Sequence, residues 1–383
     1  MLVNYITAGE SHGKCLTAII EGIPAGMPFD KSKIDAYLKL RQGGYGRGGR
    51  MKIESDMVEV TSGVRGSVTM GSPITLVIRN RDFENWQPFM DDAEIQPGKE
   101  VTKPRPGHAD LAGSLKYGHR DVRNVLERAS ARETAVRVAV GAVCAMVLEQ
   151  FGVRLLSHVV QLGHIQAASD YHAPDFAERV LASSVRCADR EASMQMERLI
   201  DERKASGDSV GGVAEIVAQN VVPGLGSYVQ WNKKLDARIA YALMSIQSVK
   251  GVSFGVGFEA ATRPGSEVHD EIFYEPGRGY YKKTNRAGGI EGGMSNGEDI
   301  VARAAFKPIP TLYRPLMTVD METGAPVSAA VERSDTCAVP AGAVVAETVM
   351  AIALAEVYLE TFGCDYLEDS LHHYRNYQAR ISR

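Results

Sequence analysis

The sequence predicts an α+β fold, organised as one large domain with several long glycine-rich loops. The first third of the chain is rich in short apolar segments and turn residues, which are typical of β-strands. Later segments are longer, carry helix-capping residues and repeat their apolar side chains at helical spacing. No Pro/Ser-rich linker or low-complexity tract divides the 383 residues. These observations favour one domain over the two that the length prior suggests.

Strands are expected on both sides of the first glycine-rich loop and again before residue 80. They are Leu2–Thr7, Leu16–Glu21, Ile53–Val60 and Ile74–Ile78, with Gly63, Gly66 and Gly71 in the turns between the last two. Asp30 is expected to cap a helix on which Ile34, Tyr37, Leu38 and Arg41 share one face. Further strands are expected at about 210–217, 252–260 and 316–320.

The clearest expected helix runs from Ser130 to Gly152. Ser130 and Glu133 have the S-x-x-E spacing of a capping box, and Gly152 stands where a helix-ending glycine is expected. Nearly every residue from Ala135 to Leu148 is apolar, so this helix is expected to be buried on all sides. Other helices are expected at about 189–206, 233–248 and 341–362, the last with Pro340 near its first turn.

The composition indicates a cytoplasmic globular protein without nucleic-acid or membrane partners. Lysine and arginine total 43 against 47 acidic residues, so the formal net charge of −4 does not favour binding to a polyanion. The five cysteines form no C-x-x-C pair, and an odd number favours a reducing compartment. The N-terminal residues lack the pattern of a signal peptide. The longest nearly apolar run, Val138–Leu148, is too short to cross a bilayer.

The first glycine-rich loop, within "TAGESHGKCL" at residues 7–16, places a histidine between two glycines. Gly9 and Gly13 contribute no side-chain burial and cost backbone entropy, so the chain needs an unusual backbone path around Ser11 and His12. Such a path is expected to hold His12 at a functional site.

A second segment, "RQGGYGRGGRMK" at residues 41–52, holds four cationic residues, five glycines and no acidic residue. Arginine presents forked donors that suit carboxylates and phosphates, and glycine lets backbone amides approach the same anion. We interpret this segment as a small-anion site. A solvated loop and a segment that binds single-stranded nucleic acid are the alternatives.

Two further segments join basic residues to a turn or to a helix start. "RPGHAD" at residues 105–110 sets His108 in a glycine/proline turn, and imidazole exchanges protons near neutral pH. "ERASARE" at residues 127–133 places Arg128 and Arg132 at the start of the buried helix, where free N–H groups favour phosphate. A surface histidine and a plain capping box are the alternatives. No H-E-x-x-H motif or Cys/His cluster favours a metal site.

Three segments in the last hundred residues are also rich in glycine, proline or charge. "GGIEGGMSNG" at 288–297 lacks the spacing of a P-loop. "KPIPT" at 307–311 fixes Lys307 on a proline-stiffened turn, and "ERSDTCAVP" at 332–340 brings Arg333, Ser334 and Asp335 together before the last long helix. A connector and surface charge are the alternatives for the last two.

Taken together, these segments resemble the chorismate synthase family. "GESHG", "RQGGYGRGGRMKIESD", "RPGHAD", "ERASARETA", "ALMSIQSVKG", "GGIEGGMSNG", "KPIPT" and "RSDTCAVP" are similar to the family's motifs and follow its order between residues 9 and 340. The resemblance implies a β-α-β sandwich, assembled as a homotetramer. It also implies a carbon–oxygen lyase of the shikimate pathway for aromatic amino acids, which forms chorismate by anti-1,4-elimination of phosphate from 5-enolpyruvylshikimate 3-phosphate.

The same resemblance implies reduced FMN as the cofactor, although the reaction has no net redox change. NADPH is then an external reductant, and a separate flavin reductase is needed because no extra segment of the chain would house one. "GYGRGGRMK" is similar to the monofunctional form found in Gram-positive bacteria and relatives. Gly49 stands where close relatives often have arginine, so one possible anion contact is lost.

The resemblance also implies roles for individual residues. His12 resembles an acid beside the flavin, His108 the acid that protonates the departing phosphate, and Asp335 the group that assists proton transfer at flavin N5. The implied flavin contacts are Arg128, Ala129, Ser130, Gln247, Ser248, Gly292, Lys307, Pro308, Ile309, Pro310, Thr311 and Arg333. The implied substrate or nicotinamide contacts are Arg41, Arg47, Arg50, Arg105 and Arg132, with Ser11 supporting the His12 loop.

Two other classes of function compete with this lyase. A non-catalytic anion- or RNA-binding protein would use the Arg/Gly segment, and its binding would depend steeply on salt and not at all on flavin. A phosphotransferase is disfavoured because the sequence has no P-loop and no recognisable acidic pair for Mg²⁺.

Overall fold

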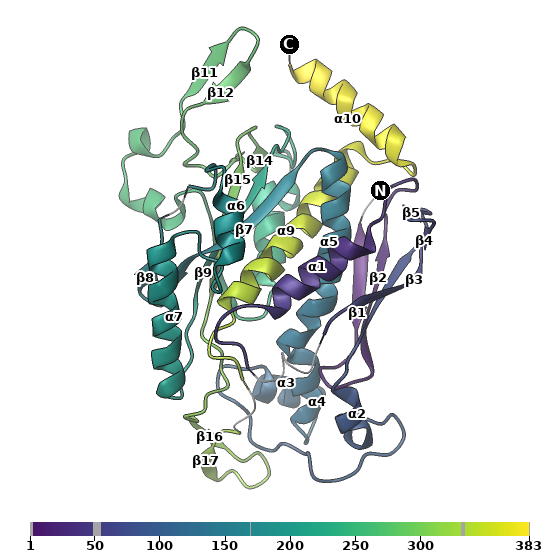
Figure 1. Ribbon diagram of the computed structural model, residues 1–383, viewed down its shortest axis with the longest axis vertical. Helices are drawn as coiled ribbons and strands as arrows, with labels where there is room; N and C mark the ends of the chain where they lie inside the picture. Colours follow the sequence, from purple (N-terminus) through teal and green to yellow (C-terminus); the bar gives the residue numbers. More distant parts are fainter. Residues whose placement is uncertain (1–2, 49–54, 169, 331–333, 383) are drawn as a thin grey trace.

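Two antiparallel β-sheets enclose a layer of helices in the computed structural model, which describes residues 3–48, 55–168, 170–330 and 334–382 (Figure 1). The first sheet has the strand order β1 (Asn4–Ala8), β2 (Cys15–Glu21), β6 (Ile74–Arg79) and β3 (Val58–Ser62). The second has the order β10 (Val249–Phe254), β15 (Ile300–Phe306), β9 (Gly212–Gln219), β7 (Arg154–Leu162) and β8 (Ile165–Gln166).

The first sheet turns one apolar face toward the helices. Residues Leu16, Ala18 and Ile20 of β2 are buried and alternate with more exposed neighbours, and so do Ile74, Leu76 and Ile78 of β6. The antiparallel register pairs these two sets directly, with Leu16 opposite Ile78 and Ile20 opposite Ile74. Because strand side chains alternate between faces, this pairing gives a continuous apolar surface on one side.

The helical layer consists chiefly of α1 (Lys31–Gln42), α5 (Thr134–Gln150) and α9 (Val339–Phe362). Helix α5 packs against β2 and β6 of the first sheet, α9 packs against β7 and β9 of the second, and the two helices pack on each other. Both are buried on nearly every face, as expected for helices covered on both sides. Gly141 of α5 permits this contact, because a Cβ there would lie 2.3 Å from the carbonyl oxygen of Thr348 in α9.

Helix α9 corrects the expectation that Val138–Leu148 is the longest nearly apolar run. It is longer than the run Val138–Leu148, and by length and composition it is the one helix among the described residues that would suffice to cross a membrane. However, 94% of its most apolar window is buried inside the protein. Its apolar character is therefore that of a core helix between two sheets.

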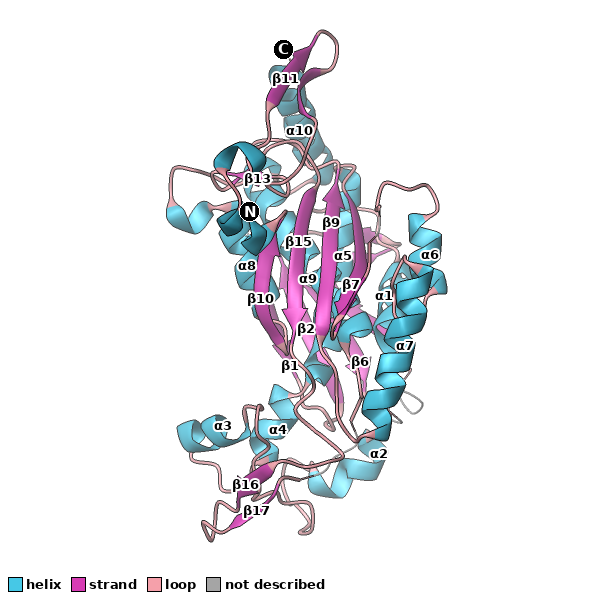
Figure 2. Ribbon diagram, turned by 90° about the vertical axis from the view of Figure 1, so that its left-hand side faces the viewer, coloured by secondary structure: helices cyan, strands magenta, loops and turns pink. Residues whose placement is uncertain are grey.

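The remaining helices lie around this sandwich (Figure 2). Helix α8 (Leu235–Met244) packs on α9, and α10 (Leu367–Ile381) follows α9 in the chain. Helices α6 (Phe176–Ala182) and α7 (Arg190–Ala205) lie on the opposite side from α8. At one end of the long axis are α2 (Phe83–Trp86), α3 (Asp110–Tyr117) and α4 (Arg123–Ala129). Short 3₁₀ helices are η2 (Gln87–Phe89), η3 (Ala131–Glu133), η4 (Trp231–Lys233), η5 (Gly257–Thr262) and η6 (Gly265–Glu267).

Four two-stranded hairpins complete the secondary structure of the described residues. They are β4–β5 (Val64–Arg65 and Val68–Thr69), β11–β12 (Ile272–Glu275 and Gly279–Lys282), β13–β14 (Ile290–Glu291 and Met294–Ser295) and β16–β17 (Met317–Val319 and Pro326–Ser328). The β16–β17 hairpin lies at the same end as α3 and α4, whereas β11 and β13 lie at the other end (Figure 2).

Several expected boundaries are confirmed. The side chain of Asp30 caps α1 by accepting a hydrogen bond from the Ser32 N–H. Gly152 follows α5 with φ +81°, and Pro340 lies in the first turn of α9. The expected helices at 189–206 and 233–248 correspond to α7 and to η4 with α8, and the expected strands at 210–217 and 316–320 correspond to β9 and β16.

Other expectations need correction. Ser130 caps the short helix η3 by accepting from the Arg132 N–H, and the Glu133 carboxylate accepts from Thr7 and Gln247, so the full capping box does not form. The strand expected at 252–260 ends at Phe254, where Gly255 and Gly257 take positive φ before η5. Leu2 and residues 53–54, which belong to two expected strands, lie outside the described residues.

Candidate functional site

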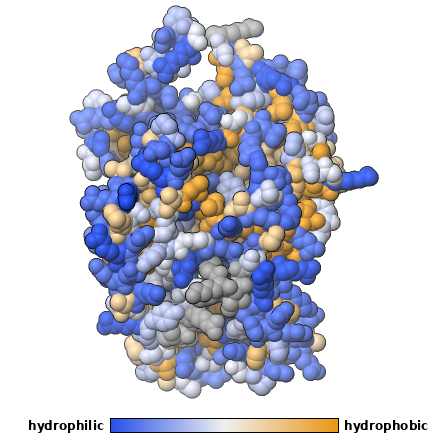
Figure 3. Space-filling model, in the orientation of Figure 1, coloured by the Kyte–Doolittle hydropathy of each residue, from blue (hydrophilic) through white to orange (hydrophobic). Residues whose placement is uncertain are grey.

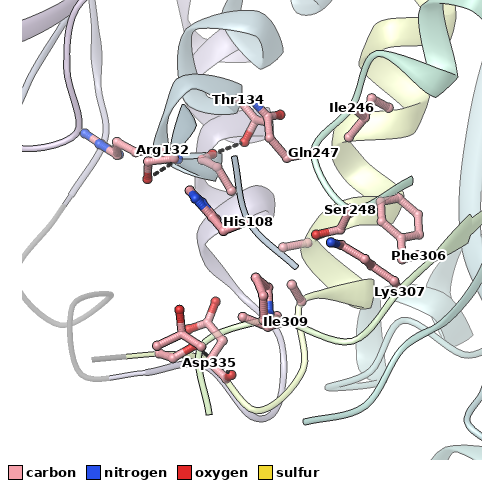
Figure 4. A pocket seen from close by; sticks show the side chains of 18 of the residues that line it. His108, Arg132, Thr134, Ile246, Gln247, Ser248, Phe306, Lys307, Ile309 and Asp335 are labelled. Carbon is pink, nitrogen blue, oxygen red and sulfur yellow. Dashed lines mark hydrogen bonds between the residues drawn. The ribbon is translucent and has the colours of Figure 1, made fainter. Parts of the chain in front are cut away.

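A cavity of about 430 Å³ lies where the N-terminal ends of α5 and α9 meet the loop before α3 (Figure 4). Its polar wall comes from segments that are far apart in the sequence, whereas Leu126, Ile246, Phe306, Val339 and Val345 supply apolar surface. Unpaired N–H groups and a partial positive charge mark the starts of helices, so two helix N-termini at one cavity favour an anionic ligand.

Most of the predicted site residues that the structure describes line this cavity. They are Arg41, Arg47, Arg105, His108, Ala129, Ser130, Arg132, Gln247, Ser248, Lys307, Ile309, Pro310, Thr311 and Asp335. Five described residues are not part of its lining: Ser11, His12, Arg128, Gly292 and Pro308. Arg50 and Arg333 lie outside the described residues.

Gly292 was expected to contact the flavin, and among the predicted residues outside the lining it lies farthest from the cavity. It forms the turn between β13 and β14, is exposed and has φ +59°. This hairpin lies at the end of the molecule opposite α3 and α4 in both ribbon views (Figures 1 and 2). Within one chain, Gly292 is therefore remote from the cavity.

Arg41 and Arg132 share one buried carboxylate behind the cavity wall. Arg132 Nη1 donates to Asp56 Oδ2 at 2.7 Å, and Arg41 Nη1 lies 3.5 Å from the same oxygen. Arg41 also donates from Nε to the Thr134 hydroxyl at 3.0 Å and from Nη2 to the Ala131 carbonyl at 3.0 Å. Burial, only partly offset by the charge of Asp56, lowers the pKa of Arg41 to about 9, so this side chain stays cationic at neutral pH.

Arg47 and Asp335 form an ion pair at the cavity. Arg47 Nη1 lies 2.7 Å from Asp335 Oδ2, and the Gly48 N–H donates to Asp335 Oδ1 at 2.6 Å. The glycine is needed here, because a Cβ at position 48 would lie 2.9 Å from the carbonyl oxygen of Ser334. The basic segment and the segment before α9 are therefore joined at this point.

His108 and Arg105 converge on one buried carboxylate, that of Asp110. Asp110 accepts from the Arg105 backbone N–H at 3.0 Å and from Arg105 Nε at 2.8 Å, and its other oxygen contacts His108 Nδ1. Burial alone raises the pKa of Asp110, but the hydrogen bonds from His108 and Arg105 outweigh it and hold this pKa well below its usual range. Lys307 Nζ donates to the carbonyl of Gly107 and so borders the same turn (Figure 4).

His12 has a similar arrangement next to the cavity. Its ring Nδ1 lies 2.8 Å from Glu127 Oε1, and its backbone N–H donates to Glu127 Oε2 at 2.8 Å. The imidazole stacks on Trp86 with centroids 4.1 Å apart. Burial raises the pKa of Glu127, but the contacts with His12 and Arg123 outweigh it, and the net shift is downward.

The His12 loop is tied to the cavity wall by two side chains. Asn80 donates to the carbonyls of Glu10 and Gly13 at 3.1 and 2.7 Å, and its own carbonyl accepts from Arg132 Nε at 2.9 Å. The Ser11 hydroxyl donates to Ser130, which lines the cavity. Gly9 has φ +108°, and a Cβ there would lie 2.3 Å from the Cys15 carbonyl, so the loop requires this glycine.

The opposite wall of the cavity carries Gln247, Ser248 and Lys307. Gln247 Nε2 donates to Glu133 at 3.2 Å, whereas its buried Oε1 has no hydrogen-bond partner. Ser248 has φ +72°, a conformation that non-glycine residues adopt at a cost, and its carbonyl accepts from the Lys307 N–H. Arg128 instead donates to the carbonyls of Thr7 and Gly9, outside the lining.

Sequence comparison identifies the family. A model of the chorismate synthase family matches residues 3–359. A chorismate synthase of Caldicellulosiruptor bescii is 58% identical over 367 residues, which cover 95% of this chain and 96% of that protein. The chain belongs to the chorismate synthase family. A chorismate synthase of Pelobacter propionicus is 56% identical over 393 residues and 99% of both chains. A solved structure titled as the crystal structure of chorismate synthase is 42% identical, with a TM-score of 0.81 over 100% of this chain and 99% of that one.

Membership confirms the fold class and the reaction that the sequence motifs imply. The α+β sandwich is that of the solved chorismate synthase. The family's reaction is the anti-1,4-elimination of phosphate from 5-enolpyruvylshikimate 3-phosphate, so the chain is a carbon–oxygen lyase of the shikimate pathway that acts on a phosphorylated substrate. Members of the family use reduced flavin.

Sequence reasoning missed the partners that hold these site residues in place. They are Asp56, Asn80, Trp86, Asp110 and Glu127. Asp110 and Glu127 stand inside the segments "RPGHAD" and "ERASARE", so an acidic residue beside a candidate histidine or arginine was the available signal. Asp56 closes the segment "RQGGYGRGGRMKIESD" that also holds Arg41, whereas Asn80 and Trp86 stand outside every quoted segment, and only the fold brings them to the site.

Proposed function

We propose that the cavity at the N-terminal ends of α5 and α9 is the active site of this lyase. One observation carries the proposal: Arg41, Arg47, Arg105, Arg132 and Lys307 come from four separate segments and line one cavity of about 430 Å³. The substrate carries one phosphate and two carboxylates, and several arginines suit such a ligand better than one. Arg50 is part of the same proposal on sequence grounds.

FMN occupies the same cavity in this proposal. The apolar residues Leu126, Ile246, Phe306 and Val339 suit an isoalloxazine ring, and the buried Gln247 Oε1 without a partner suits a ring N–H donor. The residues that would hold it are Ala129, Ser130, Gln247, Ser248, Lys307 and residues 308–311, with Arg128 and Arg333 as proposed contacts from the sequence. When bound in its reduced form, FMN would supply electron density for cleavage of the C–O bond, with no net change in its oxidation state.

The side chains around the substrate divide the acid–base work. His108 protonates the departing phosphate, because it lies beside Arg105 and in the same cavity as Lys307. Asp335 assists transfer of the proton that the substrate loses, and its carboxylate is held by Arg47 and the Gly48 N–H. His12 acts beside the flavin from a loop that Ser11 and Asn80 tie to Ser130 and Arg132.

We further propose that the chain is a single domain that works as a homotetramer in the cytoplasm. One hydrophobic cluster includes core residues of both sheets and of α5 and α9, which supports a single domain. All five cysteines have free thiols, which suits a reducing compartment. Trp231 and Tyr241 leave 79% and 82% of their surface exposed, and such apolar side chains are typical of contacts between copies.

An anaerobic assay tests the function. With substrate and reduced FMN, kept reduced by NADPH and a separate flavin reductase, the protein should release phosphate and form a conjugated diene that absorbs in the ultraviolet. Oxidised FMN should bind without turnover. Turnover with oxidised flavin and no reductant would contradict the proposed cofactor role, and salt-steep RNA binding without flavin-dependent turnover would favour the competing class.

A further inference from the structure

His108 lies against a carboxylate that the proposed mechanism leaves without a role. Asp110, the first residue of α3, is completely buried, and its two oxygens contact His108 Nδ1 and three nitrogens of Arg105. Four donors around one buried carboxylate satisfy it well, since an ionised carboxylate accepts hydrogen bonds and donates none.

The contacts fix the direction of the hydrogen bond to His108. Because Asp110 is ionised, its oxygen can only accept, so Nδ1 of His108 must carry the proton. Arg105 Nη2 lies 3.1 Å from the same Nδ1, but it already donates to Asp110 Oδ1 at 3.1 Å, and a protonated Nδ1 cannot accept from it. Nε2 is then the ring nitrogen that remains for proton transfer.

We propose that Asp110 is a positioning residue, which keeps a proton on Nδ1 of His108 so that the imidazolium donates its Nε2 proton to the departing phosphate and is left as the neutral Nδ1–H tautomer. The inference rests on the proposed role of His108. The charged groups around this imidazole are Arg105 and Asp110 in direct contact and Lys307 at the Gly107 carbonyl, with Arg47, Arg132 and Asp335 in the same cavity.

The protein contains a matched control for this arrangement. In the second sheet, His158 Nε2 lies 3.0 Å from Glu215 Oε1, and Arg303 Nε donates to Glu215 Oε2 at 2.8 Å. This group also joins a buried histidine, a carboxylate and an arginine, but none of its members lines the cavity. Glu215→Gln should therefore lower the melting temperature and leave the pH dependence of turnover unchanged.

A double-mutant cycle separates Asp110 acting through His108 from Asp110 acting through Arg105. Asp110→Asn alone should lower kcat by roughly 10- to 100-fold, the usual cost of removing the outer partner of a functional histidine. It should also move the alkaline limb of the kcat profile to lower pH, because loss of a neighbouring negative charge disfavours the protonated imidazole. Added to His108→Ala, it should change kcat by less than about twofold, whereas added to Arg105→Ala it should keep its full effect.

The outcomes distinguish the acid role of His108 from the positioning role of Asp110. Full activity of folded His108→Ala would remove the proposed acid role, whatever Asp110 does. Impaired His108→Ala combined with a full additional loss from Asp110→Asn would overturn the positioning role alone. A measurement without turnover completes the test: long-range ¹H–¹⁵N spectra of the free wild-type protein should show the neutral form of His108 as the Nδ1–H tautomer, identified by the signal missing in His108→Ala. An Nε2–H tautomer there would overturn the inference even where Asp110→Asn does not fold.

Discussion

Arg41 and Arg47 stand six residues apart, but the fold gives their guanidinium groups different surroundings. Arg41 is buried and uses its donors on Thr134 and the Ala131 carbonyl at the start of α5. Arg47 pairs with Asp335, whose side chain is 22% exposed. A ligand anion can therefore replace the carboxylate at Arg47, whereas Arg41 also holds the protein's own backbone.

Replacing each of these arginines by alanine separates an effect on ligand affinity from an effect on the stability of the fold. Arg47→Ala should weaken substrate binding about ten- to a hundredfold, since a charge-assisted contact contributes about 1.5–3 kcal/mol, and should change FMN affinity much less. Arg41→Ala should also lower the melting temperature, because it leaves the Ala131 carbonyl and Asp56 short of a donor. Fluorescence titration with each ligand and thermal melting measure both effects. Equal losses of substrate and FMN affinity in Arg47→Ala would contradict a substrate role.

His12 should contribute to stability as well as to turnover, because it is the partner of buried Glu127. His12→Ala should cost roughly 10²–10⁴ in turnover and about 1.5–3 kcal/mol of unfolding free energy at pH 7. The pKa of Glu127 is lowered in the folded protein, so its stabilisation is complete above its unfolded pKa of 4.5 and is lost as pH falls through the folded value.

Denaturant titrations between pH 7 and pH 3 check this dependence. The stability difference between wild type and His12→Ala should shrink as the pH falls from about 4.5 through the lower folded pKa of Glu127, where the folded carboxylate becomes protonated. The control is His172→Ala, because the His172 side chain is 63% exposed. A difference that stays constant down to pH 3 would exclude the Glu127 pair as its source.

At the residue scale, the sequence predicted the groups that meet a ligand better than the groups that hold them. Glycine-flanked histidines and clustered arginines are visible locally, and most of those predicted residues line one cavity. Glu127 and Asn80 act on the His12 loop across separations of 115 and 67 residues. No local pattern reports such a pairing, because it depends on how α4 and the end of β6 meet that loop.

At the scale of elements, α5 and α9 do two things at once. They form the middle of the core, and the first residues of both line the cavity. Their contact at Gly141 and Thr348 therefore sets the distance between two walls of the site. A residue that pushes the helices apart should affect both the core and ligand binding.

Gly141→Ala tests this coupling through the sign of its effect. If helix propensity alone mattered, alanine would stabilise α5 by about 1 kcal/mol. The new Cβ would lie 2.3 Å from the Thr348 carbonyl, so we expect destabilisation by about 1–3 kcal/mol and weaker substrate binding. Ala142→Gly, at the next position of α5, should also destabilise the protein, because it loses helix propensity and a buried methyl group, but it adds no Cβ against α9 and should leave substrate binding near the wild-type value. A stabilised Gly141→Ala protein would show that the helices separate without cost.

The strands that could not be predicted from the sequence are those in which polar or charged side chains interrupt the apolar pattern. The long apolar helices were predicted because they are apolar on every face. Strands β7 and β15 were not, because His158 and Arg303 break their apolar pattern. Glu215 of β9 lies opposite both residues and neutralises them, which makes polar side chains acceptable in the sheet. The short helices α3 and α4 lie in segments that read as loops.

At the scale of the whole molecule, the two ends of one face differ in hydropathy. The face in Figure 3 is mostly hydrophilic at the end that carries α3 and α4, and apolar side chains gather toward its middle and upper part. The β13–β14 hairpin, whose turn contains Gly292, lies toward the end of the molecule away from α3 and α4. If Gly292 contacts FMN as its sequence motif suggests, it does so in the site of another copy, and assembly and flavin binding are then linked.

This linkage makes the assembly testable through a ligand. Sedimentation of the wild-type protein should give a mass four times that of one chain. Tyr241→Asp places a charge on a side chain of α8 that is 82% exposed, and we expect it to dissociate the assembly and to weaken FMN binding at the same protein concentrations. Leu181→Asp is the matched control, because Leu181 is 62% exposed on α6, on the opposite side of the molecule from α8. A dissociated Tyr241→Asp protein that binds FMN as tightly as wild type would show that one chain completes its own flavin site, and Gly292 would then have no part in it.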